Sequence, residues 1–252
     1  MPRASRHYVP QHVWHITHRC HRRQFLLKFV RDRLVLRQWL YTACRRHGLC
    51  VLDYATTSNH IHLLVRDRGH GEIARSLQLV AGRTAQGYNE RKGRHGAFWE
   101  DRYHATAVET GEHLARCLVY IDLNMVRAGA VAHPREWKGA GYQEIQQEPE
   151  RCRVVNRAAL AEALEIESVG SLAAIHSEWI ETALRTGAQA RMPEWSESVA
   201  VGGRAFVEGV AASLGVRAKS RQIETCGEFS VLRETPASYS RRFGAGIARL
   251  TR

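Results

Sequence analysis

The first half of the chain is expected to fold as an α+β domain with a ferredoxin-like core. Four short segments alternate apolar and polar residues as strands do, and two longer segments repeat apolar residues at helical spacing. These segments follow one another in the order β-α-β-β-α-β, which is typical of a four-stranded antiparallel sheet with helices on one face. A further helix follows this core, and the remainder of the chain is expected to form a mainly helical annex.

The predicted strands and helices of the core have ordinary lengths. In the first strand His15 and Thr17 share one face while Trp14 lies on the other, because side chains alternate along a strand. Gly48 ends the first helix, as a C-terminal glycine does. In chain order we predict a strand at 12–20, a helix at 29–48, strands at 49–58 and 60–67, a helix at 71–93 and a strand at 97–110.

The composition of the chain changes after the third helix, which is predicted at 112–129. The polar and acidic segment "YQEIQQEPERC" (142–152) indicates a linker or surface connection. We therefore divide the chain into a domain at 1–140 and an annex at 141–252, and we expect the annex to support the core without supplying catalytic groups. The elements predicted within the annex are helices at 157–184 and 203–214 and a hairpin at 221–234.

The distribution of charge points to nucleic acid as a partner. The net charge is +12, and residues 1–130 carry 21 Lys and Arg against 10 Asp and Glu, whereas residues 131–252 carry 16 against 15. Arginine supplies most of the excess, and its planar guanidinium suits phosphates and base edges. A basic surface that serves only solubility is the simpler alternative. The concentration of the charge in one half of the chain favours a polyanion.

The sequence lacks the signs of a membrane or secreted protein. No stretch approaches the roughly 18 consecutive apolar residues of a membrane span, and the basic start lacks the apolar core of a signal peptide. The six cysteines include no CxxC pair, so we expect neither a disulfide framework nor a structural zinc site. We therefore expect a cytoplasmic, nucleoid-associated protein that does not bind membranes.

Two histidines in the third predicted strand form a candidate ligand pair. His60 and His62 lie two residues apart, so their side chains project from the same face, about 7 Å apart along the strand. Two imidazoles in this arrangement can bind one metal ion or one phosphate. The alternative is a half-buried strand with a polar outer face, since this tripeptide pattern also occurs by chance.

The third helix carries a second pair of candidate residues. Tyr120 and Asn124 are four residues apart and therefore project from one face of the helix. If the helix crosses the open face of the sheet, two imidazoles and one amide oxygen could bind a divalent ion and leave coordination positions open. The phenol hydroxyl could then attack phosphorus. Taken singly, Tyr120 could be a core aromatic residue and Asn124 a helix cap.

Basic and aromatic residues from the end of the second predicted helix onward are candidates for DNA contact. Aromatic rings stack on unpaired bases, and cations bind the phosphates. The alternative is an aromatic core beside a solvated basic loop. The candidate DNA-binding residues are Arg91, Lys92, Arg94, Trp99, Arg102, Tyr103 and Arg127, with Tyr88 as a second candidate for stacking.

Three separated blocks of the sequence resemble a known family. The blocks are "NHIHLLV" (59–65), "YNERKGRHGAFWEDRYHA" (88–105) and "YIDLNMVRAGAV" (120–131). In order and spacing they resemble the REP-associated tyrosine transposases, which belong to the single-tyrosine HUH nucleases. The resemblance covers roughly residues 8–140. The usual Met-Pro before the Asn-His is here Thr-Ser, and the usual Asn-Pro-Val-Arg is here Asn-Met-Val-Arg at 124–127.

The resemblance implies a reaction and a role for each candidate residue. His60, His62 and Asn124 would bind Mg²⁺ or Mn²⁺, and Tyr120 would be the nucleophile that forms a 5′-phosphotyrosine and leaves a 3′-hydroxyl. The substrate would be single-stranded DNA beside an imperfect REP-like hairpin. The resemblance implies DNA cleavage and strand transfer, that is transposition, by a monomer or a homodimer, and it leaves open whether cleaved strands are rejoined.

Two other functions compete with this one. The two-histidine RNA phosphoesterases pair two H-x-Thr/Ser motifs, and "HIT" at 15–17 would serve as one motif, but residues 60–62 place a histidine where the hydroxyl belongs. A domesticated transposase that binds hairpin DNA without cutting it is the second alternative. The presence of both histidines, the tyrosine and the asparagine argues against such a loss of activity.

Overall fold

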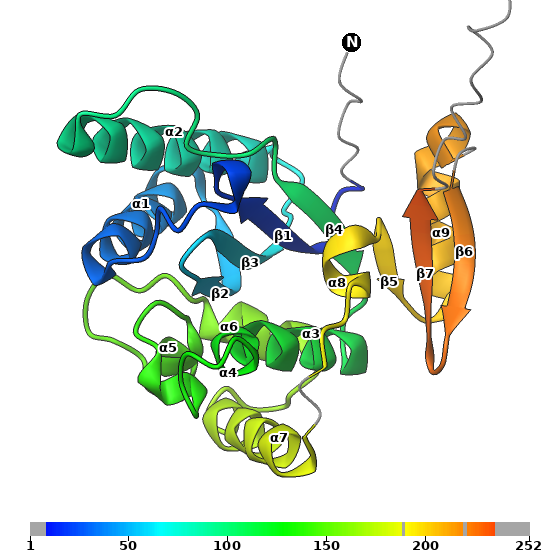
Figure 1. The fold of residues 1–252 in the computed structure, drawn as a ribbon. Helices are drawn as coiled ribbons and strands as arrows, with labels where there is room; N and C mark the ends of the chain where they lie inside the picture. The colour runs from blue at the N-terminus through cyan, green and yellow to red at the C-terminus, as the bar shows by residue number, and fades with distance from the viewer. Residues whose placement is uncertain (1–8, 188–189, 219–220, 235–252) are drawn as a thin grey trace, which may run out of the picture.

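A single twisted sheet runs through the molecule, and helices cover both of its faces (Figure 1). The computed structural model describes residues 9–187, 190–218 and 221–234. The strands are β1 Val13–Arg19, β2 Cys50–Thr56, β3 His60–Arg66, β4 His104–Val108, β5 Ala200–Gly202, β6 Arg221–Cys226 and β7 Phe229–Glu234. The helices are α1 Val30–His47, α2 Glu72–Lys92, α3 Glu112–Asp122, α4 Asn124–Arg127, α5 Tyr142–Gln146, α6 Arg157–Ala163, α7 Leu172–Thr186, α8 Glu194–Glu197 and α9 Arg204–Leu214, with short 3-10 turns at His21–Arg23, Pro134–Glu136 and Gly215–Ala218.

The first four strands form the predicted ferredoxin-like core. Their order in the sheet is β2-β3-β1-β4, and every neighbouring pair is antiparallel. Helices α1 and α2 pack against each other on one side of these strands, whereas α3, α5, α6 and α7 lie on the other side (Figure 1). The predicted fold class is confirmed. The register places His62 between Thr17 of β1 and Ala55 of β2.

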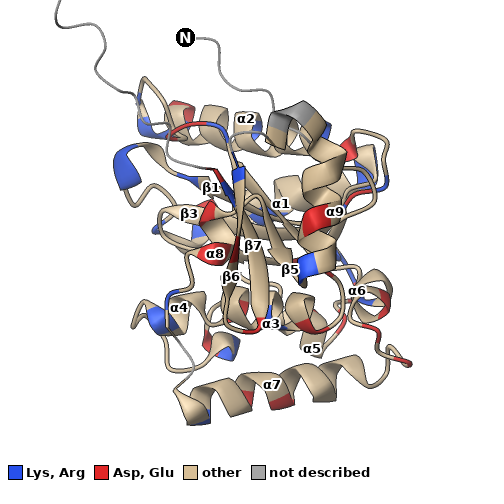
Figure 2. Ribbon diagram, turned by 90° about the vertical axis from the view of Figure 1, so that its right-hand side faces the viewer, with Lys and Arg blue, Asp and Glu red and all other residues tan. Residues whose placement is uncertain are grey.

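The annex extends the same sheet in addition to supplying helices. β5 lies parallel to β4, with Ala200 opposite Ala107, and β7 and β6 continue the sheet beyond it. Figure 2 shows these strands with α9, which packs beside them. The predicted hairpin at 221–234 is present as β6 and β7, whereas β5 was not predicted. A strand of three residues is too short for its alternation of side chains to be recognised.

Several predicted elements are shorter than expected or are interrupted. The strand predicted at 97–110 begins only at His104, and before it Trp99 makes an isolated bridge to Cys20. The helix predicted at 157–184 is two helices, α6 and α7, and Glu165 between them has a φ of +60°. The described helices include none with both the length and the apolar character that crossing a bilayer requires.

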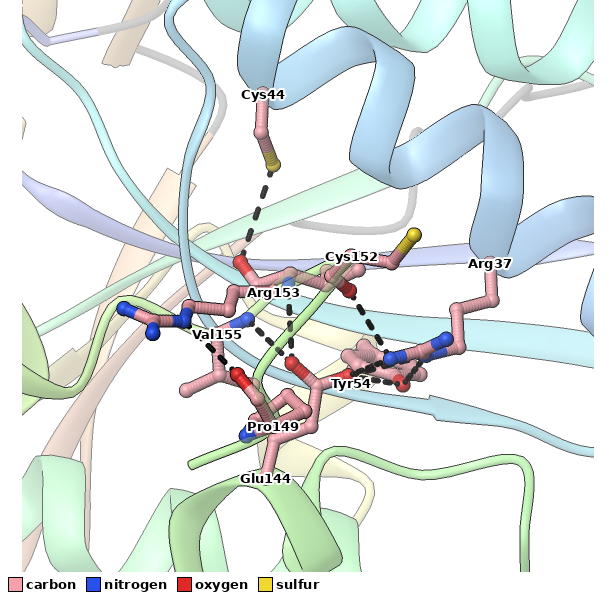
Figure 3. Close-up of polar contacts among 9 residues, drawn as sticks. Arg37, Cys44, Tyr54, Glu144, Pro149, Cys152, Arg153 and Val155 are labelled. Carbon is pink, nitrogen blue, oxygen red and sulfur yellow. Dashed lines mark hydrogen bonds and ion pairs between the residues drawn. The ribbon is translucent and has the colours of Figure 1, made fainter. Parts of the chain in front are cut away.

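The segment predicted as a linker, 142–152, is packed onto the core. It begins with α5, and the Glu144 carboxylate is buried against α1 and β2 (Figure 3). This carboxylate accepts hydrogen bonds from the Tyr54 hydroxyl at 2.9 Å and from the backbone N–H of Val154 at 2.8 Å. It also forms an ion pair with Arg37 at 3.0 Å. The prediction of a surface connection was therefore wrong for residues 142–146, because Glu144 bonds to partners on α1 and β2, whereas residues 147–152 are mostly exposed.

Candidate active site

His60 and His62 project from β3 toward the side of the sheet that carries α3. Their Nε2 atoms lie 3.0 Å apart, and their ring planes are inclined at 76°. His62 is buried, with 3% of its surface exposed, while His60 is half-buried at the start of the strand. The alternation of side chains along β3 thus brings the two imidazoles together as predicted.

The orientation of the His60 ring is fixed by its neighbours. Its Nδ1 lies 2.7 Å from Oδ1 of Asn59 and 2.9 Å from the Thr57 hydroxyl. The Asn59 amide nitrogen donates to the Arg23 carbonyl at 3.1 Å, which leaves the Asn59 oxygen to face His60. Because that oxygen can only accept, the His60 Nδ1 donates a proton to it, and Nε2 keeps its lone pair.

The outer side of the His62 ring contacts a third histidine. The His62 Nδ1 lies 2.9 Å from Nε2 of His15 on β1, and the two rings are stacked with centroids 5.1 Å apart. The His15 Nδ1 in turn lies 2.7 Å from the backbone carbonyl of Trp195 in the annex. His15 was not predicted as a site residue. Its place on the same strand face as Thr17, which pairs with His62, is the signal that could have identified it.

Asn124 is brought to the histidines by a break in the third helix. The helix predicted at 112–129 ends as α3 at Asp122, and Leu123 has a ψ of 2° before the single turn of α4 begins. The Asn124 amide Nδ2 then lies 2.9 Å from Nε2 of His62. The helix therefore crosses the sheet face, as the function inferred from the sequence requires.

Tyr120 lies on the same side, one turn before Asn124. Its ring is edge-on to His62, with centroids 6.2 Å apart, and only 8% of the residue is exposed. The Arg127 guanidinium lies 4.2 Å from the centre of the Tyr120 ring and donates to the Tyr120 carbonyl at 3.1 Å. Burial raises the pKa of the Tyr120 phenol, and the positive charge of Arg127 opposes that rise. The phenol is therefore protonated at neutral pH.

The chemistry of these donors fits a divalent metal ion. Burial, assisted by the charges of Arg19 and Arg127, lowers the pKa of His60 to about 4, and burial lowers the pKa of His62 well below its usual value. Both imidazoles are consequently neutral at pH 7 and can offer a lone pair. Two ligands at right angles, each about 2.1 Å from an ion, lie about 3.0 Å apart. The separation of the two Nε2 atoms is also 3.0 Å.

The ligand set would combine two imidazoles with an amide and would contain no carboxylate. Across the described ranges of the chain, no group of three or more His, Cys, Asp or Glu side chains has the geometry of a metal site. An ion at His60 and His62 would therefore use Asn124 as its third protein ligand, after a turn of the amide that presents its oxygen. The remaining coordination positions would be open to substrate oxygens.

These residues line one cavity of about 840 Å³ that also contains residues of the annex. Arg191, Ser196, Glu197 and Glu234 reach it from beyond residue 140. The sequence offered no sign of this contribution, because the annex residues are scattered along the chain. The remaining lining residues are mostly polar or charged and include Thr17, Arg19, Arg23, His60, His62, Asp101, Arg102, Tyr120, Asn124 and Arg127.

Comparison with protein families gives a match in the N-terminal part of the chain. The family described as IS200-like transposases matches residues 8–124. This match covers slightly less than half of the 252 residues. The matched segment includes β1 to β4, α1 to α3 and, at its last residue, Asn124, whereas Arg127 and the annex lie outside the match.

Two solved structures are similar to parts of the chain at low sequence identity. A REP-associated tyrosine transposase bound to a REP hairpin is 16% identical with a TM-score of 0.49, and the match covers 62% of this chain and 94% of that chain. A "putative transposase" from Deinococcus radiodurans R1 is 18% identical with a TM-score of 0.35, and the match covers 46% and 91% of the two chains. Comparison with curated proteins gives no match.

The predicted DNA-contact residues fall into three groups. Arg102 lines the cavity, and so does Arg127 just beyond the matched segment. The basic residues at the end of α2 do not line it, because Arg91 forms an ion pair with Asp32 and Arg94 donates to the Asn89 side chain at 3.0 Å. Lys92 is exposed at the same end of α2.

The aromatic candidates make up the third group and are held in the fold. The half-buried Trp99 ring stacks on His18 at 4.2 Å, and its indole N–H donates to the Ala81 carbonyl at 3.0 Å. Tyr103 is 9% exposed and stands edge-on to His18. The half-buried Tyr88 ring packs against Phe98 with centroids 5.1 Å apart.

Proposed function

We propose that this protein is a metal-dependent endonuclease and strand transferase that acts on single-stranded DNA beside an imperfect palindromic hairpin. The observation that carries the proposal is the meeting of four side chains in one cavity. His60 and His62 face each other at 3.0 Å, Asn124 lies 2.9 Å from His62, and the Tyr120 ring stands edge-on to His62. The match of residues 8–124 to the IS200-like transposases supports the same reaction class.

His60, His62 and Asn124 would hold Mg²⁺ or Mn²⁺, and the bound ion would polarise the scissile phosphate and stabilise charge on its oxygens. Oxygen is the preferred ligand of these ions, and a DNA phosphate supplies it to the open positions. The two neutral imidazoles require no loss of a proton before binding, because their pKa values are already lowered.

Tyr120 would supply the nucleophile. Its Oη forms a bond to phosphorus, the bond from phosphorus to the 3′ oxygen breaks, and the phenol loses its proton while the leaving oxygen gains one. The products are a 5′-phosphotyrosine and a 3′-hydroxyl. Arg127 lies over the Tyr120 ring and favours the phenolate, since its charge lowers the pKa that burial raises. Attack of a 3′-hydroxyl on the phosphotyrosine reverses these steps and rejoins the strand.

The geometry supports cleavage within one subunit. Tyr120 lies beside His62 of the same chain, with the ring centroids 6.2 Å apart, so a second copy is not required to complete the site. We therefore propose that Tyr120 acts in cis, whether the protein is a monomer or a homodimer.

Two features of the sequence support the proposed substrate. The hairpin is inferred from the resemblance of the three sequence blocks, and the preference for a polyanion is inferred from the charge of residues 1–130.

A covalent-trapping experiment tests the proposed reaction against the non-cleaving alternative. The full-length protein is incubated with Mn²⁺ and a labelled DNA hairpin that carries a single-stranded flank, and the products are separated under denaturing conditions. A labelled band at the mass of the protein plus the cleaved strand is the expected result. Hairpin binding without any covalent band would instead identify a domesticated DNA-binding protein.

A further inference from the structure

A chain of hydrogen bonds connects the annex to the candidate metal ligand. His15 on β1 is completely buried, and it lies between the Trp195 carbonyl at 2.7 Å and the His62 Nδ1 at 2.9 Å. Trp195, in α8, is also completely buried, and its ring lies 6.0 Å from that of Phe229 on β7. The contact therefore joins residues separated by 180 positions in the sequence.

The direction of each hydrogen bond in this series follows from the Trp195 carbonyl, which is its first member. A backbone carbonyl can only accept, so the proton between Trp195 and His15 belongs to the His15 Nδ1. The ring is completely buried, which disfavours its charged form, so it is neutral and its Nε2 is an acceptor. The His62 Nδ1 must then donate to it, and the His62 Nε2 is left without a proton. That is the atom facing His60 and Asn124.

We propose that His15 is a positioning residue. The Trp195 carbonyl fixes the His15 ring, and His15 in turn holds His62 in the tautomer whose Nε2 can bind a metal ion. This inference rests on the proposed function, in which His62 is a ligand. It assigns a role to the annex that the family match does not cover, since Trp195 lies outside residues 8–124. Partners of this kind fix the ring orientation and the basicity of metal-binding histidines.

Two substitutions of His15 separate positioning from packing. His15→Leu keeps a buried side chain of similar size but removes both hydrogen bonds. His15→Gln supplies an amide N–H for the Trp195 carbonyl and an amide oxygen for the His62 Nδ1, so it can replace both bonds. His133→Leu is the matched control, because His133 is a buried histidine outside the cavity whose Nε2 lies 3.2 Å from a Glu181 carboxylate oxygen.

The first readout is the affinity of the DNA-free, full-length protein for Mn²⁺, measured by calorimetry. We expect His15→Leu to weaken binding by about 10- to 100-fold, whereas His15→Gln and His133→Leu stay within a few-fold of the parent. Parental affinity in a folded His15→Leu variant would overturn the proposal. Equal losses in His15→Leu and His15→Gln would also overturn it, because the effect would then be one of packing.

The second readout is the tautomer of His62 in the metal-free parent protein, observed by ¹⁵N NMR of the imidazoles. The expected state has the proton on Nδ1, and a proton on Nε2 would overturn the proposal even if no variant folds. This measurement also separates the inference from the proposed function. If the protein forms no covalent adduct with DNA, the proposed function fails, while the His62 tautomer and the Mn²⁺ affinities still decide the role of His15.

An independent observation concerns the surface at the start of α1. Four large apolar side chains stand exposed between residues 25 and 34, and Phe25 and Phe29 are the most exposed of them at 65% and 58%. The remaining two are Val30 and Leu34. We call this set the Phe25–Leu34 patch. An exposed apolar patch of this kind usually marks a contact with a partner.

The charges around the patch are positive. The exposed charged residues between positions 21 and 34 are Arg22, Arg23, Lys28 and Arg31, and the acid of this segment, Asp32, is buried in an ion pair with Arg91. The Lys92 ammonium lies 5.4 Å from the centre of the Phe29 ring. Aromatic rings interleaved with cations are the arrangement that binds single-stranded nucleic acid without sequence preference.

The segment that carries the patch is tied to the candidate active site. Arg23 lines the cavity, and its carbonyl accepts a hydrogen bond from Asn59, the residue before His60. The Leu27 N–H donates to the Ser58 carbonyl at 2.9 Å, which fixes the same segment to the turn that leads into β3. Phe25 follows Arg23 by two residues, so DNA bound in the cavity at Arg23 would lie near the patch.

We infer that the Phe25–Leu34 patch binds the single-stranded flank of the substrate, with unpaired bases stacked on Phe25 and Phe29. This inference also rests on the proposed function. The test compares a hairpin with a single-stranded flank and the same hairpin without one, using fluorescence anisotropy at fixed salt. Phe25→Ala and Phe29→Ala are expected to weaken binding of the flanked hairpin about tenfold each and to leave the flankless hairpin unchanged.

Two controls make this test specific. Leu34→Ala shortens an apolar residue of the same patch that cannot stack, and Phe25→Trp retains a ring, so both should bind the flanked hairpin as the parent does. Equal losses on the two DNAs, or a loss with Leu34→Ala equal to that with Phe25→Ala, would overturn the inference. So would a concentration-dependent dimer that Phe25→Ala dissociates, because the patch would then join two copies of the chain. The binding measurement requires no cleavage and is thus decided separately from the proposed reaction.

Discussion

The Nε2 atoms of His60 and His62 lie 3.0 Å apart on the side of the sheet that carries α3. In the proposed tautomers, in which each ring holds its proton on Nδ1, both Nε2 atoms present a lone pair. A metal ion between them would bind both lone pairs, as the proposed function requires. Burial of both imidazoles keeps them neutral and so maintains this arrangement at physiological pH.

Replacement of either histidine should separate cleavage from DNA binding. We expect His60→Ala and His62→Ala to abolish metal-dependent cleavage while hairpin affinity changes by less than about threefold, because phosphate contacts elsewhere supply most of the affinity. A nicking assay and a binding titration on the same preparations provide the two measurements. If His62→Ala cuts at the parental rate, the pair is only the polar face of a strand.

Binding should depend strongly on salt and on the form of the DNA. The net charge of +11 within residues 1–130 indicates many phosphate contacts, and each neutralised phosphate adds about 0.7–0.9 to the slope of log K against log salt. We expect a steep slope and a preference for a hairpin with a single-stranded flank over blunt duplex. Equal affinity for the two DNAs, or a slope near zero, would show that the basic surface does not serve DNA binding.

Arg127 should affect the rate of cleavage more than the affinity for DNA. Its guanidinium lies over the Tyr120 ring, and its charge lowers the pKa of a phenol whose burial raises it. With saturating DNA, Arg127→Met is expected to slow single-turnover cleavage at least about tenfold, since a charge that stabilises the phenolate is lost. Arg116→Met is the control, because Arg116 pairs with Glu112 and Glu228 outside the cavity. Equal rates for parent and Arg127→Met would remove Arg127 from the mechanism.

Asp53 should make the stability of the fold depend on pH. Burial, followed by the charges of Asp122 and Glu144, raises the pKa of this carboxyl well above its usual value. The folded state thus keeps a proton that the unfolded state releases above about pH 4, so stability falls as the pH rises above that value. Asp53→Asn, which is neutral at every pH, is expected to be more stable than the parent at pH 7, by on the order of 1 kcal/mol or more.

Urea denaturation at pH 4 and at pH 7 measures the difference in stability between Asp53→Asn and the parent protein. Glu90→Gln is the control, because Glu90 is exposed on α2. The advantage of Asp53→Asn should disappear at pH 4, where the parent carboxyl is protonated in the folded state. A variant that is destabilised equally at both values would mean that shape and hydrogen bonding, and not charge, determine the contribution of Asp53.

Local patterns in the sequence predict much of the fold and of the site, whereas contacts between distant segments are missed. Alternation along β3 places His60 and His62 together, and the four-residue spacing of Tyr120 and Asn124 places both on the same side of the sheet. The break between α3 and α4 was not predicted. The role of Glu144 and the contact between His15 and Trp195 could not be predicted either. Glu144 bonds to Tyr54 and Arg37, and His15 bonds to Trp195, and no local pattern in these segments indicates such distant partners.

The identity of the nucleophile is the central claim, and mass spectrometry of the trapped protein–DNA adduct tests it most directly. The parent protein is expected to carry the DNA on Tyr120, and Tyr120→Phe should fold, bind DNA and bind Mn²⁺ as the parent does while forming no adduct. The closest competitor is Tyr103, which follows Arg102 at the cavity. If the DNA were found on Tyr103, or if Tyr120→Phe still formed the adduct, the assignment of the active site would be contradicted.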